Sequence, residues 1–581
     1  MSNHQAAGES PATAAYRTAR DQLLELHGDH ARAVREFRHP DVGDTFNWGV
    51  DWFDAIARGN EKPALTVMAE DGSSVSVTFD DMARRSDRVA AWLAGLGVER
   101  GQAVLVMLGN QVEMWEAVLG IMKLGAVIMP TATAVGPEEL GDRIRRGGAV
   151  AVITSAADAA DVDEVAGDFL RIAVGGDPGG SWLDFADAAR LETGPASHPG
   201  TTPSDPLLYY FTSGTTSRPK LVQHSQVSYP VGHLSTMYWL GLRPGDVHLN
   251  ISSPGWAKHA WSSVFAPWIA EATIFVLSYA RFDAESLLRV LRTYQVTSLC
   301  APPTVWRMLL GADLSGGPGA LREVVGAGEP LNPEVIGQIQ RAWGLTIRDG
   351  YGQTETTASV GNVPGEELKP GSMGRPLPGV PVAIVDPVTD EVIVGAGEGE
   401  ICLDRQQHPM SLMSGYLTDE GALIEGRTAD GRWYRTGDVA SVDEDGYVTY
   451  IGRTDDVFKA SDYKISPFEL ESVLIEHPAV AEAAVVPAPD PVRLAVPKAY
   501  ISLTAGHEPG PEVAKDVLAH ARARLAPWQR VRRIEFADLP KTISGKIRRV
   551  ELRSREGVLA AENSSRPVLE WRDEDFPELK S

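Results

Sequence analysis

Short runs of apolar residues without polar alternation are the feature that most limits how this chain can fold. Such runs occupy residues 103–108, 126–129, 149–153, 272–277 and 298–301. Segments with helical periodicity lie between them, for example at 113–124, where Gly125 would end the helix. A strand without alternation is buried on both faces, as in a parallel sheet that helices cover on both sides. We therefore expect an α/β protein with parallel sheets.

The glycine content and the hydrophobic pattern of the sequence change toward the C-terminus. Residues 374–450 contain many glycines and short alternating segments, which predict an antiparallel β subdomain. Beyond Asp455 the alternation of helices and strands indicates a compact α+β unit of ordinary domain size. The expected parts are an N-terminal arm and helix at 1–45, a large domain at 46–454, a small domain at 455–560 and a frayed acidic tail at 561–581.

The composition excludes several classes of protein. The 581 residues are 43% apolar and 23% charged, as in soluble globular proteins of more than one domain. A formal net charge of −24 would repel nucleic acids and anionic membranes. Cys300 and Cys402 both lie in apolar surroundings and cannot form a disulfide framework or a cysteine metal site. Because the N-terminus is polar and no apolar segment is long enough to span a bilayer, the sequence predicts a cytoplasmic protein.

The stretch from Thr212 to Lys220 consists mostly of hydroxyl residues and glycine, and it follows an apolar strand at 207–211. The end of such a strand presents backbone N–H and side-chain O–H groups to an anion, and the lysine adds positive charge. It is not a Walker A loop, because Pro219 precedes Lys220 and Leu221 follows it. The stretch predicts a phosphate cradle, and the alternative is an ordinary polar loop between two strands.

Five later segments carry groups that a bound nucleotide requires. They are residues 326–330, 349–356, 434–438, 452–456 and 540–549. Glycines in the first of these segments let the backbone approach a flat purine. A glutamate in the segment 349–356 is a suitable ligand for a hard cation such as Mg²⁺. An aspartate in the segment 434–438 can accept hydrogen bonds from two ribose hydroxyls, and the segment 540–549 is a basic loop. Each segment alone is also compatible with a turn or a surface salt bridge, so the specificity lies in their order.

In this order the segments resemble the adenylate-forming superfamily of acyl-CoA synthetases, peptide-synthetase adenylation domains and luciferases. Within this superfamily, the motifs at residues 210–215, 351–356, 467–471 and 477–480 are most similar to those of medium-chain acyl-CoA synthetases. The resemblance covers about residues 50–555. It implies an α/β fold with a large N-terminal domain of two doubly wound parallel-rich sheets, an antiparallel β subdomain and a small mobile α+β C-terminal domain. It also implies that ATP activates a carboxylic acid to an acyl-adenylate with release of pyrophosphate, and that coenzyme A then displaces AMP.

The resemblance implies roles for individual residues. Lys546 would bridge the acid and the α-phosphate, Thr354 would contact the α-phosphate and Glu355 would hold Mg²⁺. Asp455 would be the hinge of the small domain. The other nucleotide-binding residues would be Thr212, Ser213, Gly214, Thr215, Thr216, Lys220, Gly328, Glu329, Pro330, Asp349, Gly350, Tyr351, Asp438 and Arg453. The implied partners are a small carboxylic acid, ATP and coenzyme A, with no nucleic acid and no membrane span.

The segment after the hinge departs from the superfamily's usual Ser-Gly-Tyr-Arg-Ile-Gly-Pro and reads SDYKISP at 461–467. The residues expected to line the thiol tunnel are Asp462, Tyr463 and Lys464. The acidic side chain would meet an anionic cofactor there, and Ser466 and Leu494 also replace usual glycines. The acceptor is therefore either coenzyme A in a modified tunnel or the phosphopantetheine thiol of a carrier protein. A non-catalytic nucleotide-binding protein is a third interpretation.

Residues 255–261 occupy the region that shapes the acyl pocket in the superfamily. Trp256 and His259 would line this pocket, with Ala327 and Gly328 as its floor. The region lacks the aspartate with which amino-acid-activating domains bind an α-amino group, so an α-amino acid is not expected. The indole walls favour a medium-length or bulky, largely apolar acid, and an aryl acid is the alternative.

Overall fold

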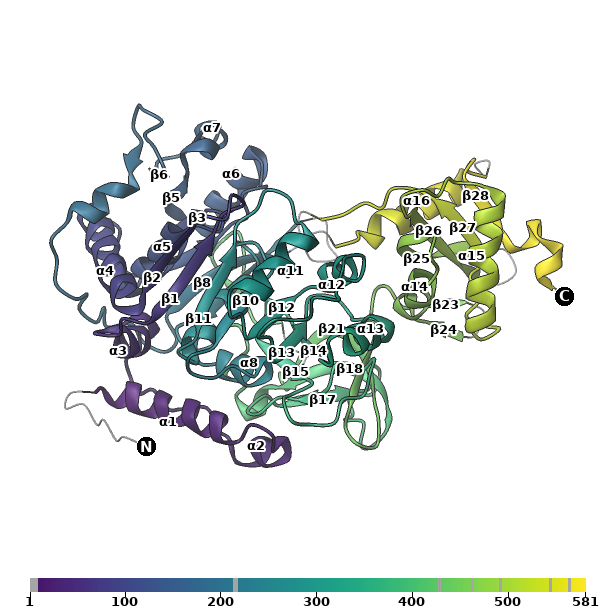
Figure 1. The fold of residues 1–581 in the computed structure, drawn as a ribbon, viewed down its shortest axis with the longest axis horizontal. Helices are drawn as coiled ribbons and strands as arrows, with labels where there is room; N and C mark the ends of the chain where they lie inside the picture. The colour runs from purple at the N-terminus through teal and green to yellow at the C-terminus, as the bar shows by residue number, and fades with distance from the viewer. Residues whose placement is uncertain are drawn as a thin grey trace. The chain divides into compact units, whose positions relative to one another are not determined.

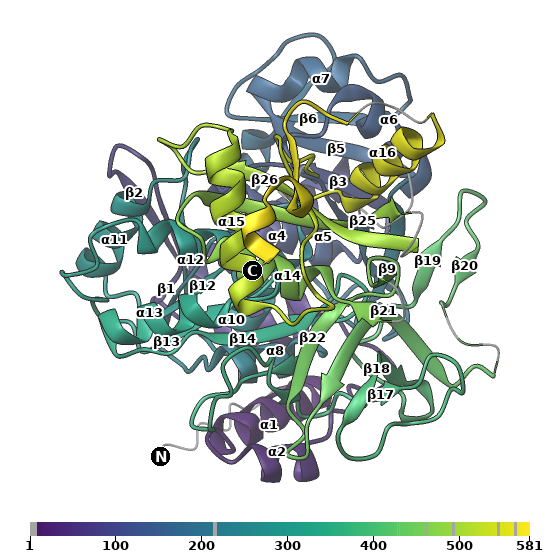
Figure 2. The same cartoon turned by 90° about the vertical axis from the view of Figure 1, so that its right-hand side faces the viewer.

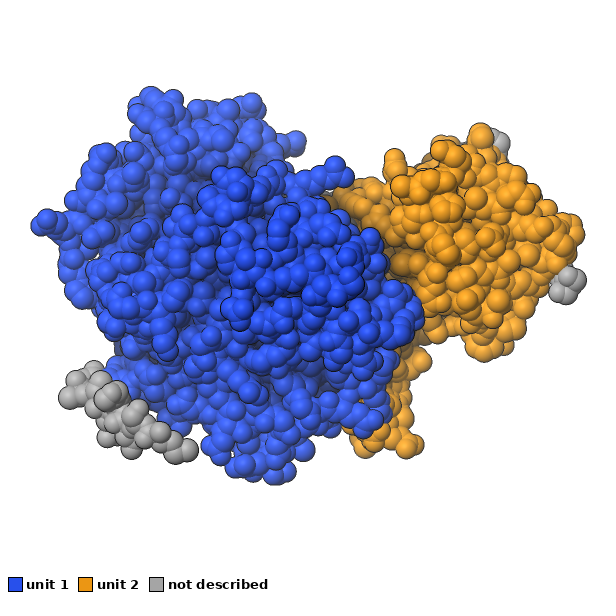
Figure 3. Space-filling view, in the orientation of Figure 1, with its two compact units in different colours: residues 1–214, 218–382, 403–434 blue, residues 215–217, 383–402, 435–581 orange. Residues whose placement is uncertain are grey.

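The computed structural model describes residues 9–212, 218–426, 428, 430–460, 463–490, 494–542, 546–562 and 566–580. Their contacts divide the chain into two compact units, blue and orange in Figure 3. Within the described residues, the first unit holds 9–212, 218–382 and 403–434, and the second holds 383–402 and 435–580. This division does not coincide with the boundary expected at Asp455, which stays a prediction.

The first unit contains a sheet whose order is β16-β15-β14-β13-β12-β10-β11-β1-β2 (Figure 1). The strands from β1 through β11, β10, β12 and β13 to β14 are parallel, and the edge strands are antiparallel. Their bounds are β1 Pro63–Met68, β2 Ser74–Thr78, β10 Val247–Asn250, β11 Thr273–Leu277, β12 Ser298–Ala301, β13 Glu323–Gly326, β14 Arg348–Gly352, β15 Ala358–Gly361 and β16 Arg375–Pro376.

A second sheet of the same unit has the order β20-β19-β9-β8-β4-β3-β5-β6-β7. Strands β8, β4, β3, β5, β6 and β7 run parallel, whereas β9, β19 and β20 add antiparallel pairs at one edge (Figure 2). Their bounds are β3 Ala103–Met107, β4 Val127–Pro130, β5 Ala149–Ser155, β6 Leu170–Val174, β7 Leu183–Asp184, β8 Pro206–Thr212, β9 Lys220–Ser225, β19 Gly415–Leu417 and β20 Leu423–Ile424. The two parallel-rich sheets that the sequence predicts are confirmed.

Helices connect the parallel strands and bury their apolar faces against the two sheets. The predicted helix at 113–124 is α5 Val112–Leu124, and Gly125 ends it in the left-handed conformation with φ 78°. The other helices of the unit, apart from α1 and α2, are α3 Ala55–Ala57, α4 Phe79–Gly95, α6 Pro137–Gly147, α7 Ala159–Asp163, α8 His233–Leu240, α9 Ala257–Ala260, α10 Ala266–Ile269, α11 Ala284–Thr293, α12 Pro303–Leu310 and α13 Pro333–Trp343. The same unit also contains two short π-helical segments, η1 Trp48–Asp54 and η4 Trp261–Phe265, and the 3₁₀ segments η2 Ala156–Asp158, η3 Phe185–Arg190 and η5 Arg405–Gln407. None of the helices among the described residues has the length and apolar character needed to cross a bilayer.

The N-terminal segment, which was expected to form an arm and a helix, contains two helices in its described part. Helices α1 (Pro11–Glu25) and α2 (His30–Glu36) both pack on the first unit. The Tyr16 side chain is fully buried, and its hydroxyl donates to the Pro230 carbonyl at 2.8 Å. The alanine-rich sequence concealed this, because the apolar stripe of α1 consists largely of small residues.

The second unit combines the predicted antiparallel β subdomain with the predicted α+β unit. Its strands form the sheets β17-β18-β21-β22, β23-β24 and β25-β26-β27-β28. The strand bounds are β17 Val382–Val385, β18 Gly397–Asp404, β21 Trp433–Val442, β22 Val448–Arg453, β23 Phe458–Ala460, β24 Tyr463–Ile465, β25 Val480–Asp490, β26 Leu494–Leu503, β27 Arg533–Phe536 and β28 Glu570–Arg572. The helices are α14 Pro467–Ile475, α15 Pro511–Arg524 and α16 Arg549–Ala561.

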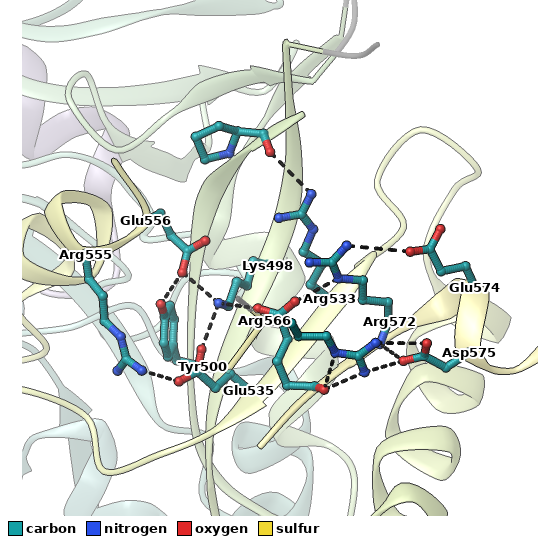
Figure 4. Close-up of polar contacts among 12 residues, drawn as sticks. Lys498, Tyr500, Arg533, Glu535, Arg555, Glu556, Arg566, Arg572, Glu574 and Asp575 are labelled. Carbon is teal, nitrogen blue, oxygen red and sulfur yellow. Dashed lines mark hydrogen bonds and ion pairs between the residues drawn. The ribbon is translucent and has the colours of Figure 1, made fainter. Parts of the chain in front are cut away.

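The acidic tail was expected to be frayed, and this expectation is wrong for residues 566–580. Strand β28 pairs with β27, and Phe576 joins the apolar core of the unit. Beneath the sheet, the buried Lys498 ammonium contacts three carboxylates, those of Glu535, Glu556 and Glu570, at 2.7–2.8 Å (Figure 4). The last of these carboxylates belongs to β28, so a buried ion pair ties the tail to the sheet.

Candidate active site

The two ends of the predicted phosphate cradle are paired residues of neighbouring strands. Thr212 ends β8, Lys220 begins β9, and the two residues are antiparallel partners. The cradle residues Ser213, Gly214, Thr215 and Thr216 lie outside the described residues. The register therefore places Thr212 and Lys220 side by side at the base of the connection between β8 and β9.

Tyr416 of β19 contacts two predicted site residues. Its hydroxyl donates to the Glu355 carboxylate at 2.8 Å, and the Lys220 ammonium lies 4.7 Å from the centre of its ring. Its position follows from the register of β19 on β9, in which Tyr416 is opposite Val222. One aromatic side chain thus joins the expected phosphate-binding lysine to the expected metal-binding glutamate by a hydrogen bond and a cation–π contact.

His224 of β9 holds the turn that carries Thr354 and Glu355. Its Nε2 lies 2.7 Å from the Thr354 carbonyl, and its Nδ1 lies 2.9 Å from the Ser228 hydroxyl. Burial lowers the pKa of His224 to about 4, so the ring is neutral at pH 7. Because a carbonyl can only accept, Nε2 carries the hydrogen and Nδ1 accepts from Ser228. The Met413 amide donates to the Glu355 carbonyl at 2.8 Å from the opposite side.

Replacing Tyr416 with phenylalanine is expected to weaken activation by Mg²⁺ rather than folding. The change removes the hydroxyl that orients Glu355, and a hydrogen bond to a charged group contributes about 1.5–3 kcal/mol, or roughly tenfold or more. We expect the Mg²⁺ concentration for half-maximal adenylate formation to rise by about tenfold. Tyr416→Leu, which also removes the ring beneath Lys220, is expected to raise the KM for ATP as well. Equal Mg²⁺ dependence in wild type and Tyr416→Phe would contradict this role.

The predicted adenine-binding segments lie at the ends of two adjacent parallel strands. Gly328, Glu329 and Pro330 follow β13, whose Gly326 pairs with Asp349 of β14. Gly328 has φ 110°, which favours glycine, and Ala327 before it is buried. Gly350 faces the indole of Trp239, where an added Cβ would lie 2.3 Å from a ring atom. The register thus places Gly328–Pro330 and Asp349–Tyr351 at the ends of two adjacent parallel strands.

Asp349 is buried, and burial raises the pKa of its carboxyl from 3.8 to about 7. Between these values the unfolded chain loses the proton and the folded chain keeps it, so this group's contribution to stability falls as pH rises toward 7. Asp349→Asn cannot ionise and can still accept the 2.9 Å hydrogen bond from the Gly350 amide. We expect the melting temperature of Asp349→Asn relative to wild type to increase from pH 5 to pH 8. A constant difference across this range, measured by thermal unfolding, would show that Asp349 does not titrate there.

Helix α9 carries the predicted acyl-pocket residue His259, and Trp256 directly precedes this helix. The Lys258 side chain of α9 lies on the Gly328 side, where a Cβ at Gly328 would be 4.0 Å from its Cδ. Trp256 and the buried His259 line a cavity together with residues of α5, β3, β4 and β8. The described residues that line this cavity do not include Ala327 or Gly328, so the structure does not bring the predicted wall and the predicted floor together there.

Asp438 and Arg453, the predicted ribose-binding pair, are cross-strand partners of β21 and β22 in the second unit. The Arg453 guanidinium lies 3.2 Å from the buried Asp438 carboxylate, and the Tyr450 hydroxyl donates to the same oxygen at 3.4 Å. Gly437 leaves room for this guanidinium, since a Cβ there would be 2.9 Å from Arg453 Nη2. The structure thus brings this predicted pair together within the unit.

The predicted catalytic lysine and hinge also lie in the second unit. Lys546 is exposed, and its amide donates to the Thr542 hydroxyl at 3.1 Å while its carbonyl accepts from the Thr542 amide at 2.8 Å. Asp455 lies in the turn after β22.

Two of the three predicted thiol-tunnel residues, Tyr463 and Lys464, lie in β24. Asp462 lies outside the described residues, whereas Tyr463 stacks on Trp528 at 5.4 Å and Lys464 lies 3.6 Å from Glu398. Ser466 caps α14 by accepting from the Glu469 amide at 3.2 Å, and it donates to the Ile451 carbonyl. Glycine cannot make these bonds, which explains serine at this position. The structure describes the backbone of Leu494, which begins β26 and pairs with Asp490 of β25.

The donor set fits Mg²⁺ that is shared with a substrate. No group of three metal-binding side chains occurs among the residues that the structure describes. Mg²⁺ usually takes one or two protein carboxylates and completes its shell with phosphate oxygens and water. A single oriented carboxylate, that of Glu355, meets this requirement, and it shares the side chain of Tyr416 with Lys220.

Comparison with known proteins identifies the family of this chain. Residues 52–417 match the family model described as AMP-binding enzyme, and residues 469–546 match its C-terminal domain. The chain is 41% identical to 4-hydroxybutyrate–CoA ligase 1 of Metallosphaera sedula over 88% of this chain and 91% of that protein. It is 35% identical to human mitochondrial acyl-coenzyme A synthetase ACSM3 over 89% and 90% of the two chains. The anthranilate CoA ligase AuaEII in complex with anthranoyl-AMP has a similar structure, with a TM-score of 0.79, 28% identity and coverage of 89% and 98%.

Proposed function

Because the chain belongs to the AMP-binding enzyme family and is an AMP-forming acid–CoA ligase, we propose that its adenylating site is assembled around Lys220, Tyr416 and Glu355. The enzyme uses ATP, Mg²⁺ and coenzyme A: it forms an acyl-adenylate with release of pyrophosphate, then an acyl-CoA with release of AMP. The observation that carries the proposal is the contact of one tyrosine with both Lys220 and Glu355, which come from distant segments.

The reaction requires two anions, the carboxylate and the triphosphate, to approach each other. Alignment and charge neutralisation dominate such phosphoryl chemistry, and no protein nucleophile is needed. Lys220 and the cradle bind the departing pyrophosphate, and Glu355 holds Mg²⁺, which neutralises phosphate charge when bound. Asp438 accepts the ribose hydroxyls beside Arg453. These roles are supported by the side-by-side placement of Thr212 with Lys220 and of Asp438 with Arg453.

Lys546 supplies the positive charge between the carboxylate and the α-phosphate. Its exposure suits a group that acts on a substrate, because a buried ammonium would be committed to a protein partner. Rotation of the C-terminal domain at Asp455 brings Lys546 to the adenylating site and withdraws it before thioester formation. The segment Asp462–Lys464 then lines the path of the pantetheine thiol.

The acid is largely apolar and of short to medium length, or aromatic. The cavity behind α9 is lined mainly by apolar side chains, which supports this class. The similar proteins named above act on 4-hydroxybutyrate and anthranilate by their names, and both acids have compact bodies. Cys300 and Cys402 are buried free thiols, which supports a reducing compartment such as the cytoplasm.

The test measures pyrophosphate, AMP and acyl-CoA formed from ATP with a panel of short alkanoic, hydroxyalkanoic and aryl acids, with and without coenzyme A. We expect acid-dependent pyrophosphate release that turns over repeatedly only when coenzyme A is present, with AMP and acyl-CoA in equal amounts. Release that coenzyme A does not stimulate would instead indicate a carrier-protein acceptor. No release with any acid would contradict the proposed function.

A further inference from the structure

Arg146 of helix α6 contacts both ends of the connection between β8 and β9. Its guanidinium donates to the Pro219 carbonyl at 2.8 Å, and Pro219 directly precedes Lys220 at the start of β9. The same guanidinium lies 5.1 Å from the centre of the Phe211 ring, near the end of β8. The Arg146 side chain is 8% exposed, so little water screens these contacts.

Arg146 is part of a group of four charged side chains that are joined by four ion pairs. Two arginines, Arg146 and Arg218, each pair with the same two carboxylates, those of Asp142 and Asp419. The N–O distances are 3.3 and 2.8 Å for Arg146 and 2.6 Å for both pairs of Arg218. Asp142 belongs to α6, and Asp419 lies in the turn between β19 and β20. We call these four residues the α6 ion cluster.

The α6 ion cluster connects two strands that carry residues of the proposed site. The bond from Arg146 to the Pro219 carbonyl fixes the peptide group that precedes Lys220. The pair with Asp419 fixes the turn that follows Tyr416 of β19. Since the Lys220 ammonium lies 4.7 Å from the centre of the Tyr416 ring, one arginine helps to hold both partners of this contact.

Arg146 is the member of the cluster on which this arrangement depends most. The side chains of Arg218 and Asp419 are 47% and 46% exposed, and exposed ion pairs contribute little. Arg146 is nearly buried and also donates to a backbone carbonyl, so its removal would take this donor from Pro219. The connection between α6 and the two strands would then depend on the exposed pairs of Arg218.

We propose that Arg146 is a positioning residue for adenylate formation. By fixing Lys220 and Tyr416 relative to each other, it keeps the phosphate-binding groups in the alignment that attack on the α-phosphorus requires. It acts through Pro219 and Asp419 rather than by contact with ATP. Pyrophosphate leaves in the first half-reaction, so thioester formation does not depend on this alignment. This inference rests on the proposed function.

The experiment compares Arg146→Met with wild type in the two half-reactions. Methionine keeps an unbranched side chain but removes both ion pairs and the bond to the Pro219 carbonyl. We expect acid-dependent pyrophosphate formation in a single turnover to slow by roughly 10-fold to 10²-fold, because a small misplacement of aligning groups has a cost of this size. Acyl-CoA formation from added acyl-adenylate should keep the wild-type rate. Arg146→Lys should recover part of the lost rate, because its ammonium can donate to one of the two acceptors.

Arg145→Met is the matched control on the same helix. The Arg145 side chain is 68% exposed and pairs with Asp142 at the surface, so both half-reactions should keep the wild-type rate. An ion cluster with a purely structural role would instead lower the melting temperature of Arg146→Met and slow both half-reactions alike. Equal losses in the two half-reactions of Arg146→Met, or no loss in either, would overturn the inference.

If Arg146→Met does not fold, Asp419→Asn provides the same test at an exposed position. It should slow pyrophosphate formation by a few-fold and leave thioester formation unchanged, and an unchanged rate of pyrophosphate formation would overturn the inference. If the wild type forms an acyl-adenylate and the variants form it equally fast, the inference fails and the proposed function stands. If the wild type forms none from any acid, the proposed function fails.

Discussion

Replacing Lys546 with alanine is expected to slow acyl-adenylate formation by about 10²–10³-fold, the usual cost of removing one charge-stabilising group from a transition state. The reason is electrostatic: without the ammonium, the carboxylate must approach the α-phosphate against uncompensated repulsion. Transfer of the acyl group from preformed acyl-adenylate to coenzyme A should be much less affected, because the proposed rotation removes Lys546 before that step.

The two steps can be measured separately, by acid-dependent pyrophosphate formation in a single turnover and by acyl-CoA formation from added acyl-adenylate. Lys541→Ala is a matched control in the same loop, since the Lys541 ammonium pairs with Glu482 at 2.7 Å. It should slow neither step by more than a few-fold. Equal losses in both half-reactions of Lys546→Ala would contradict the assignment of Lys546 to adenylation.

Replacing Lys498 with methionine is expected to destabilise the C-terminal unit by about 3–5 kcal/mol, as when one partner of a buried ion pair is removed. One cluster pairs three positive side chains with three carboxylates (Figure 4). The positive side chains are those of Lys498, Arg555 and Arg572, and the carboxylates are those of Glu535, Glu556 and Glu570. Burial acts to lower the pKa of Lys498, but hydrogen bonds to the three carboxylates more than offset it and raise the pKa. The variant leaves these carboxylates without their shared ammonium.

Chemical unfolding that is followed by hydrogen exchange at the amides of β25, β26 and β27 reports on this unit. Lys515→Met is the control, because Lys515 pairs with Glu578 on the surface, and its effect should be much smaller. Hydrogen exchange should show that β28 loses protection first in Lys498→Met, since Glu570 ties it to the sheet. If Lys498→Met and the control unfold at the same denaturant concentration, the cluster does not hold the tail.

Local patterns predicted most of the fold, and the exceptions have identifiable causes. Continuous apolar strands gave both parallel-rich sheets, and Gly125 marked the end of α5. The tail was misjudged because strand β28 and the buried Glu570 are recognisable only with Lys498, a partner far away in the sequence. The same reason applies to α1, whose Tyr16 finds its hydrogen-bond acceptor at Pro230.

The candidate site was predictable where one segment carries its own chemical signature. Lys220 and Glu355 lie in stretches rich in glycine and hydroxyl residues, which draw attention without any tertiary information. Tyr416 and His224 were missed, because a single tyrosine in a short strand and a single histidine in an apolar strand carry no such signature. Their function depends on the register of β19 on β9 and on the turn after β14, which only the folded structure shows.

The exchange of labelled pyrophosphate into ATP, with acid and Mg²⁺ present and coenzyme A absent, tests the central claim most directly. If a bound acyl-adenylate forms reversibly before any thiol takes part, label should enter ATP only when a suitable acid is supplied, and Glu355→Gln should suppress the exchange. Formation of ADP and phosphate in place of exchange, or exchange that requires coenzyme A, would contradict an adenylate intermediate.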